Sequence, residues 1–190
     1  FDSKDAVKNA GTGWFVDDLT VDTRPVAPYA TMAHCSATNL FTIGNANTTG
    51  AKWAVDATGI APKSPDCSLN FNDGTNFVCP TTATTASFSV PVPKTAGAKT
   101  FLTFSSYQDV ETSANYDRLK VVATGAKKGA ANVVKTWTVA KKAENLKKWR
   151  DHKYDLSALH GYEVTVRFEF DSKDCFSNAG KGVAVDDIMV

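Results

Sequence analysis

The segment YEVTVRFEF, residues 162–170, alternates without a break between apolar and polar side chains. Charged or hydroxyl-bearing residues separate its apolar members, which are Tyr162, Val164, Val166, Phe168 and Phe170. A period of two residues places the two sets on opposite faces of an extended chain. The pattern therefore predicts an antiparallel strand with one buried and one solvated face.

Shorter runs of the same kind occur through the second half of the chain. They are ASFSVPV (86–92), TFLTFSS (100–106), RLKVVAT (118–124) and NVVKTWTV (132–139). Glycine-containing and lysine-rich turn signals separate several of these runs. Pro91 has no backbone N–H, which predicts that its strand lies at the edge of a sheet.

Only residues 141–153, KKAENLKKWRDHK, have any helical character, and Leu146 and Trp149 are their only apolar anchors. We interpret this stretch as a solvated loop or a single helical turn. Many short strands with almost no helix predict an all-β fold, an antiparallel β-sandwich. A jelly roll is the favoured variant.

One segment type occurs at both ends of the chain. Residues 1–21, FDSKDAVKNAGTGWFVDDLTV, and residues 170–190, FDSKDCFSNAGKGVAVDDIMV, are identical at thirteen positions without a gap. A fixed offset of this kind is typical of a repeat. In the second copy, Gly180 and Gly182 are expected to turn the backbone where a Cβ would clash.

The shared segment is rich in oxygen ligands, which Ca²⁺ prefers. The predicted calcium ligands are Asp171, Asp174, Asn178, Asp186 and Asp187 in one copy, and Asp2, Asp5, Asn9, Asp17 and Asp18 in the other. The alternatives are a turn whose carboxylates bond backbone amides and, less favoured, a catalytic acid pair. Alternation places Asp186 and Asp187 on opposite faces unless a bulge intervenes.

Four cysteines without a CxxC pair indicate disulfides in an oxidising compartment rather than a zinc or thioredoxin site. Cys67 and Cys79 bracket a turn-rich stretch that a disulfide would pin. That pairing leaves Cys35 with Cys175, which is one of three connectivities. Free buried thiols are the alternative.

Composition excludes several classes of partner. The formal net charge of +1 over 190 residues gives no reason to expect nucleic acid or an anionic membrane. No apolar run approaches a membrane span, so no membrane insertion is expected. The chain has no GxSxG, HExxH or phosphate-binding glycine loop, and adjacent carboxylates on one strand cannot flank a glycosidic bond. The sequence therefore predicts a protein that is not an enzyme.

The residues also carry a family resemblance. The runs TFLTFSSYQDVETSANYD, LKVVAT, DLSALHGYEVTVRFEFDS and GKGVAVDDIMV follow one another in this order, with Tyr116-Asp117 closing the first. This order resembles the MAM-like jelly-roll domains found beside immune inhibitor A-type secreted bacterial peptidases, and the cleaved-adhesin modules of surface proteins. The match covers 87–190 and, separately, 1–21. It departs at Val183-Ala184, where the family prefers an aromatic residue.

The resemblance implies a non-catalytic, calcium-stabilised sandwich that binds glycans or proteins outside the cell or at its surface. It adds Glu111 as a weaker calcium ligand. Aromatic residues that would serve as sugar platforms are Trp53, Trp137, Trp149, Tyr107 and Phe77. A core position is favoured for each of them except Trp149, which we expect to be partly exposed.

The repeat leads to the domain organisation. We expect residues 1–21 to be a closing strand, 22–34 a linker and 35–190 the jelly-roll domain. The first strand would end a preceding repeat, complete a neighbouring subunit, or join one enlarged sandwich. The main hypothesis is an extracellular adhesive repeat that assembles with adjacent copies into filaments. The alternative is a carbohydrate-binding accessory module of a secreted hydrolase or peptidase.

Overall fold

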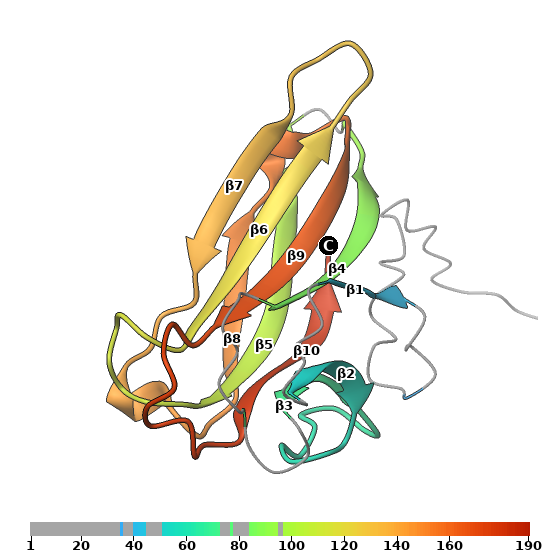
Figure 1. Ribbon diagram of the computed structural model, residues 1–190. Coiled ribbons are helices and arrows are strands. Elements are labelled where there is room, and N and C mark those ends of the chain that lie inside the picture. Colours follow the sequence, from blue (N-terminus) through green and yellow to red (C-terminus); the bar gives the residue numbers. More distant parts are fainter. Residues whose placement is uncertain (1–34, 36–39, 45–50, 73–76, 78–83, 95–96) are drawn as a thin grey trace, which may run out of the picture.

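Two antiparallel sheets face each other in the computed structural model, which describes residues 35, 40–44, 51–72, 77, 84–94 and 97–190 (Figure 1). The sheet in front in Figure 1, here called the β9 sheet, has the order β1 (Thr42–Gly44), β4 (Thr84–Val92), β9 (Tyr162–Asp171), β6 (Arg118–Ala126), β7 (Val133–Thr138). The sheet behind it, here called the β10 sheet, has the order β2 (Lys52–Asp56), β3 (Ser68–Asn72), β10 (Gly182–Met189), β5 (Phe101–Asp109), β8 (Arg150–Asp155). The predicted antiparallel β-sandwich of jelly-roll type is confirmed.

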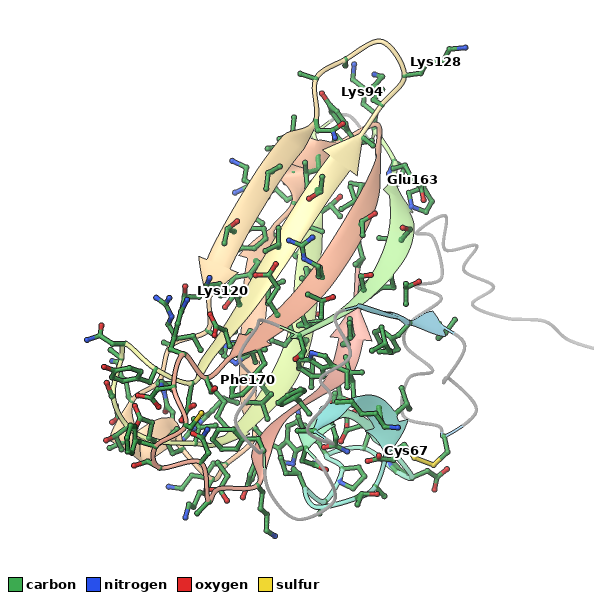
Figure 2. The ribbon with its side chains drawn as sticks, in the orientation of Figure 1. Cys67, Lys94, Lys120, Lys128, Glu163 and Phe170 are labelled. Atoms are coloured by element: carbon green, nitrogen blue, oxygen red, sulfur yellow. A yellow bond between two sulfur atoms is a disulfide. The ribbon has the colours of Figure 1, made fainter. Side chains whose placement is uncertain are left out.

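The core lies between the two sheets. The apolar side chains of β9 point into it, as the alternating pattern of residues 162–170 predicts. Val164, Val166, Phe168 and Phe170 are all fully buried. The Phe170 ring, labelled in Figure 2, lies 5.0 Å from the Phe71 ring of the opposite sheet. Burial of a large apolar side chain of this kind stabilises the fold by about 1.5–3 kcal/mol. The apolar stripe of β9 therefore joins the two layers.

The proline of β4 is accommodated because its neighbour strand is short. β1 pairs with β4 only at residues 85–87. Pro91 pairs with Glu163 of β9 on its other side. Within the described residues, the β1 side of β4 is therefore unpaired at Pro91, and the expected edge position holds locally rather than for the whole strand.

The prediction of a loop or helical turn at 141–153 is only partly right. A single 3-10 turn spans Ala143–Asn145, but β8 begins at Arg150 and pairs with β5. His152 and Tyr154 are the partly buried positions of β8, and its charged residues Arg150, Asp151, Lys153 and Asp155 are exposed. Because β8 is an edge strand with one solvated face, its many charges hid the alternation.

The terminal strand β10 lies in the middle of its sheet, between β3 and β5. The C-terminal copy of the repeated segment therefore ends in a central strand of its sheet. The predicted role of its glycines is confirmed. A Cβ on Gly180 would lie 2.0 Å from the Asp109 carbonyl oxygen, and one on Gly182 would lie 2.2 Å from that of Phe71. Only glycine lets the chain approach both neighbouring strands.

A disulfide joins Cys35 to Cys67, with the Cα atoms 5.2 Å apart. It lies beside β2, at the end of the molecule away from Lys128 (Figure 2). The predicted pairing of Cys67 with Cys79 is wrong, and so is that of Cys35 with Cys175. Cys175 is disulfide-bonded, and Cys79 lies outside the described residues. No helix in the described ranges is long and apolar enough to cross a membrane.

Candidate functional site

The adjacent carboxylates of β10 reach the same neighbour because the strand is irregular at this point. The pairing of β10 with β5 shifts register between Asp186 and Met189. Asp187 has a φ of 52°, in the left-handed region. A bulge thus intervenes between the two carboxylates. Both contact Lys63 on the outer face of the β10 sheet, Asp186 through the backbone amide and Asp187 through the ammonium.

Asp186 holds the β2–β3 connection against this outer face. Its Oδ2 accepts hydrogen bonds from the backbone amides of Lys63 at 2.9 Å and Ser64 at 3.0 Å. Its Oδ1 accepts the Ser64 hydroxyl at 2.8 Å. The side chain is 1% exposed, so a buried carboxylate with several donors replaces a water-solvated one. It is a structural anchor.

The Lys63 ammonium lies among three acceptors from three strands. It donates to Ser105 Oγ and to Asp151 Oδ1, each at 2.7 Å, and lies 3.1 Å from Asp187 Oδ2. Ser105 Oγ in turn donates to Asp151 Oδ1 at 2.6 Å. The hydrogen bond from Lys63 is the largest cause of a lowered pKa at Asp151, and that same contact raises the pKa of Lys63. Both groups are therefore ionised at neutral pH.

A cleft of about 490 Å³ opens beside this ion cluster. β5, β8 and β10 line it, together with the β2–β3 connection, through Thr103, Ser105, Asp151, Lys153, Asp187, Met189 and Lys63. Lys153 extends over the Phe101 ring, with its Nζ 4.0 Å from the ring centroid. Met189 contributes an exposed apolar surface. The cleft thus combines carboxylates and hydroxyls with the apolar surface of Met189.

The aromatic residues considered as sugar platforms divide between the core and the partly exposed surface. Trp149, expected to be partly exposed, is so, and it contacts Tyr107 at 5.7 Å between ring centroids. Its Nε1 donates to the Ala61 carbonyl oxygen at 3.3 Å. Trp53 and Phe77 belong to the core, as the sequence favoured. Trp137 is half-buried and stacks on Tyr154.

The predicted calcium ligands do not form one compact group. Asp171 Oδ1 accepts the Lys173 amide at 3.0 Å, and Asp171 Oδ2 pairs with the Lys173 ammonium. Asp174 Oδ1 accepts the Phe176 amide. Asp186 and Asp187 bind Lys63 instead. Among the residues that the structure describes, no group of three histidines, cysteines or carboxylates is placed to hold a metal. Asp2, Asp5, Asn9, Asp17 and Asp18 lie outside the described residues.

A second set of oxygens lies where the β5–β6 and β9–β10 connections meet. The Asp117 amide donates to the Ser172 carbonyl oxygen at 3.1 Å, which joins the two connections. Three side-chain oxygens here are buried without a hydrogen-bond partner, namely Glu111 Oε1, Asp117 Oδ1 and Asn178 Oδ1. Burial raises the pKa of Asp117 to about 6. The Lys141 ammonium donates to the carbonyl oxygens of Glu111 and Tyr116, and burial lowers its pKa.

Solved structures with low sequence identity share this architecture. No protein-family model matches the chain, and neither does any curated protein. The structure is similar to the enzymatically active domain of tailspike protein 4 from bacteriophage CBA120, with a TM-score of 0.53 and 10% identity over 85% of this chain and 20% of the tailspike. It is also similar to carbohydrate-binding modules of the β-sandwich superfamily, with a TM-score of 0.50 and 13% identity over 78% of this chain and 56% of that one.

A third match is a carbohydrate-binding module solved with β-1,4-galactotriose, with a TM-score of 0.49 and 11% identity over 80% of this chain and 88% of that one. The chain spans less than two thirds of the tailspike and of the β-sandwich superfamily protein. At these identities, the likeness to the first two shows the fold. The resemblance to MAM-like domains stays a prediction.

Proposed function

We propose that this chain is a non-catalytic carbohydrate-binding module and that the cleft beside Lys63 holds the sugar. The observation that carries the proposal is the cleft itself. Ion-paired carboxylates and hydroxyls converge there next to the apolar surface of Met189. Sugar rings present hydroxyls at their rim and C–H groups on their faces, so they need both kinds of surface. The β-sandwich likeness to carbohydrate-binding modules supports this choice over the adhesive repeat.

We place this activity outside the cell. The Cys35–Cys67 disulfide supports that location, because disulfides persist in oxidising compartments and are rare in the cytosol. Cys175, which is also disulfide-bonded, supports it in the same way.

A binding experiment with a blocked cleft tests the proposal. Affinity electrophoresis through gels containing soluble polysaccharides would compare the wild type with Thr103→Trp, which places a large ring in the cleft. Wild-type retardation by at least one polysaccharide is expected, with loss of retardation in the variant. Phe176→Ala is the control, because Phe176 is 77% exposed on the β9–β10 connection, outside the cleft. No retardation of the wild type by any polysaccharide would contradict the proposal.

The adhesive repeat remains a second candidate, for one specific reason. Residues 1–21 and 170–190 share several residues that pack β10 and its flanking segments against the rest of the fold. These are Phe170, Gly180, Gly182 and Asp186. The first copy lies outside the described residues. Deletion of residues 1–21 is expected to leave a folded chain that no longer assembles, as seen by electron microscopy. Unchanged assembly would reject this candidate.

We also retain calcium as a proposal, for the oxygens at the β5–β6 and β9–β10 connections. Glu111, Asp117 and Asn178 would supply ligands there, since each has a buried oxygen that lacks a partner and Ca²⁺ takes such oxygens. A bound ion would neutralise Asp117 and stabilise the fold. Addition of calcium to EDTA-treated protein is expected to raise the melting temperature of the wild type and to leave Asp117→Asn much less affected. An unchanged wild-type melting temperature would show that these oxygens do not bind a stabilising calcium ion.

A further inference from the structure

The cleft has hydrogen-bond acceptors to spare, but its central cation has no donor left. A lysine ammonium carries three N–H donors. At Lys63, three acceptors lie within 3.1 Å, namely Ser105 Oγ, Asp151 Oδ1 and Asp187 Oδ2. An anionic group entering the cleft would therefore have to displace one of these contacts. Lys63 organises the carboxylates and does not serve as a free anion receptor.

The carboxylates, by contrast, each keep one oxygen available. Asp151 engages Lys63 and Ser105 through Oδ1 alone, and Asp187 engages Lys63 through Oδ2. Within the described part of the chain, no hydrogen bond or ion pair is recorded for Asp151 Oδ2 or Asp187 Oδ1. The side chains are 80% and 35% exposed, respectively. An ionised carboxylate only accepts hydrogen bonds, so a ligand that binds these two oxygens must donate to them.

The remaining cation at the cleft, Lys153, does not reverse this balance. Its Nζ lies over the face of the Phe101 ring, 4.0 Å from the centroid, where the ring quadrupole attracts it. Phe101 pairs with Asp155, so this contact draws the ammonium toward the end of β8 away from Asp151. An anion placed at the carboxylates would therefore meet like charge, which repels it.

These contacts point to the substrate class. We propose that the cleft selects neutral, hydroxyl-rich glycans, whose hydroxyls donate to Asp151 and Asp187, and that it rejects glycans bearing carboxylate or sulfate groups. This inference rests on the proposed function and concerns the same site. Because no ion pair with the ligand forms, binding should also depend little on salt.

Isothermal titration of the full chain with matched glycans tests this inference. The neutral probes are mixed-linkage β-glucan, β-1,4-galactan and xylan, and the anionic probes are polygalacturonate, alginate and chondroitin sulfate. At least one neutral probe is expected to bind tenfold or more tightly than every anionic one, with less than a twofold change between 50 and 500 mM NaCl. Tighter binding of an anionic probe would overturn the inference and leave carbohydrate binding intact. If none of the probes binds, the result would instead count against both the proposed function and the inference.

Two variants assign the selectivity to the carboxylates. Asp151→Asn and Asp187→Asn are each expected to weaken binding of the neutral probe by fivefold or more. Each should also reduce the discrimination against polygalacturonate. Asp155→Asn is the matched control, since Asp155 is an exposed residue of the same strand β8 that does not line the cleft, and its affinity should stay within twofold. Unaltered affinity in both cleft variants, with melting temperatures near that of the wild type, would overturn the inference.

Discussion

The carboxylate of Asp186 accepts a hydrogen bond of 2.9 Å from the backbone amide of Lys63, 123 residues away in the chain. This contact fixes the β2–β3 connection on the outer face of the β10 sheet. It thereby sets the position of the Lys63 ammonium at the cleft. The lining of the cleft thus depends on a buried residue that is not itself part of that lining.

Replacement of Asp186 by alanine is expected to lower the free energy of unfolding by about 2–3 kcal/mol, because donors that a charged acceptor satisfied lose their partner. Urea denaturation measures this change. Asp151→Ala is the control, since this exposed ion pair should contribute less than about 1 kcal/mol. An equal loss of unfolding free energy in the two variants would show that Asp186 does not anchor the β2–β3 connection.

The closeness of β10 to its neighbours gives a second prediction. Gly182→Ala adds a Cβ that collides with the Phe71 carbonyl oxygen at a φ of +86°, so it should destabilise by at least about 3 kcal/mol. Gly129→Ala has a similar φ of +77° but meets no atom within 4 Å, and it should cost only about 1 kcal/mol. Thermal unfolding of both variants separates the collision from the backbone conformation. Similar melting temperatures would contradict the close approach.

The raised pKa of Asp117 leads us to expect that stability depends on pH in calcium-free buffer. Burial raises its pKa in the folded state from 3.8 to about 6. Between these values the folded protein holds a proton that the unfolded chain has released, so stability falls as the pH rises through this window. The penalty is complete at pH 7. Asp117→Asn should therefore stabilise the protein at pH 7 by roughly 3 kcal/mol and change little at pH 4. A melting-temperature difference between the two proteins that is constant from pH 4 to pH 7 would contradict this assignment.

The Cys35–Cys67 disulfide should stabilise the fold through the unfolded state. The two residues are 32 apart in sequence, and closing a loop of that length is worth about 3–4 kcal/mol in the chain-entropy model. The double variant Cys35→Ser and Cys67→Ser is expected to lose a large part of this amount in urea denaturation. A midpoint unchanged from that of the wild type would show that the cross-link does not constrain the chain.

The fold could be predicted because its strands carry a local signal. The alternation of residues 162–170 specified both the strand and its buried face. The glycines at 180 and 182 were likewise readable, since a close backbone approach leaves few other choices. In β8 the same signal failed. An edge strand with one solvated face carries so many charges that RDHKYD looks like a loop.

The site was harder to predict because it depends on contacts between distant segments. The sequence singled out Asp186 and Asp187 as oxygen-rich neighbours but assigned them to calcium. Their partner is a lysine brought in from the β2–β3 connection. Neither Lys63 nor Asp151 has a local pattern that marks it. The pairing of β8 with β5 sets Asp151 opposite Ser105, and the contact of the β2–β3 connection with Asp186 brings Lys63 to them.

An NMR titration of the isotope-labelled protein with a neutral oligosaccharide that binds tests whether the cleft beside Lys63 holds the sugar. We expect the amide signals of Lys63, Thr103, Asp151 and Asp187 to shift, and those of Tyr116 and Phe176 on the β5–β6 and β9–β10 connections to stay unchanged. Shifts confined to those two connections, with the cleft signals unmoved, would contradict this expectation.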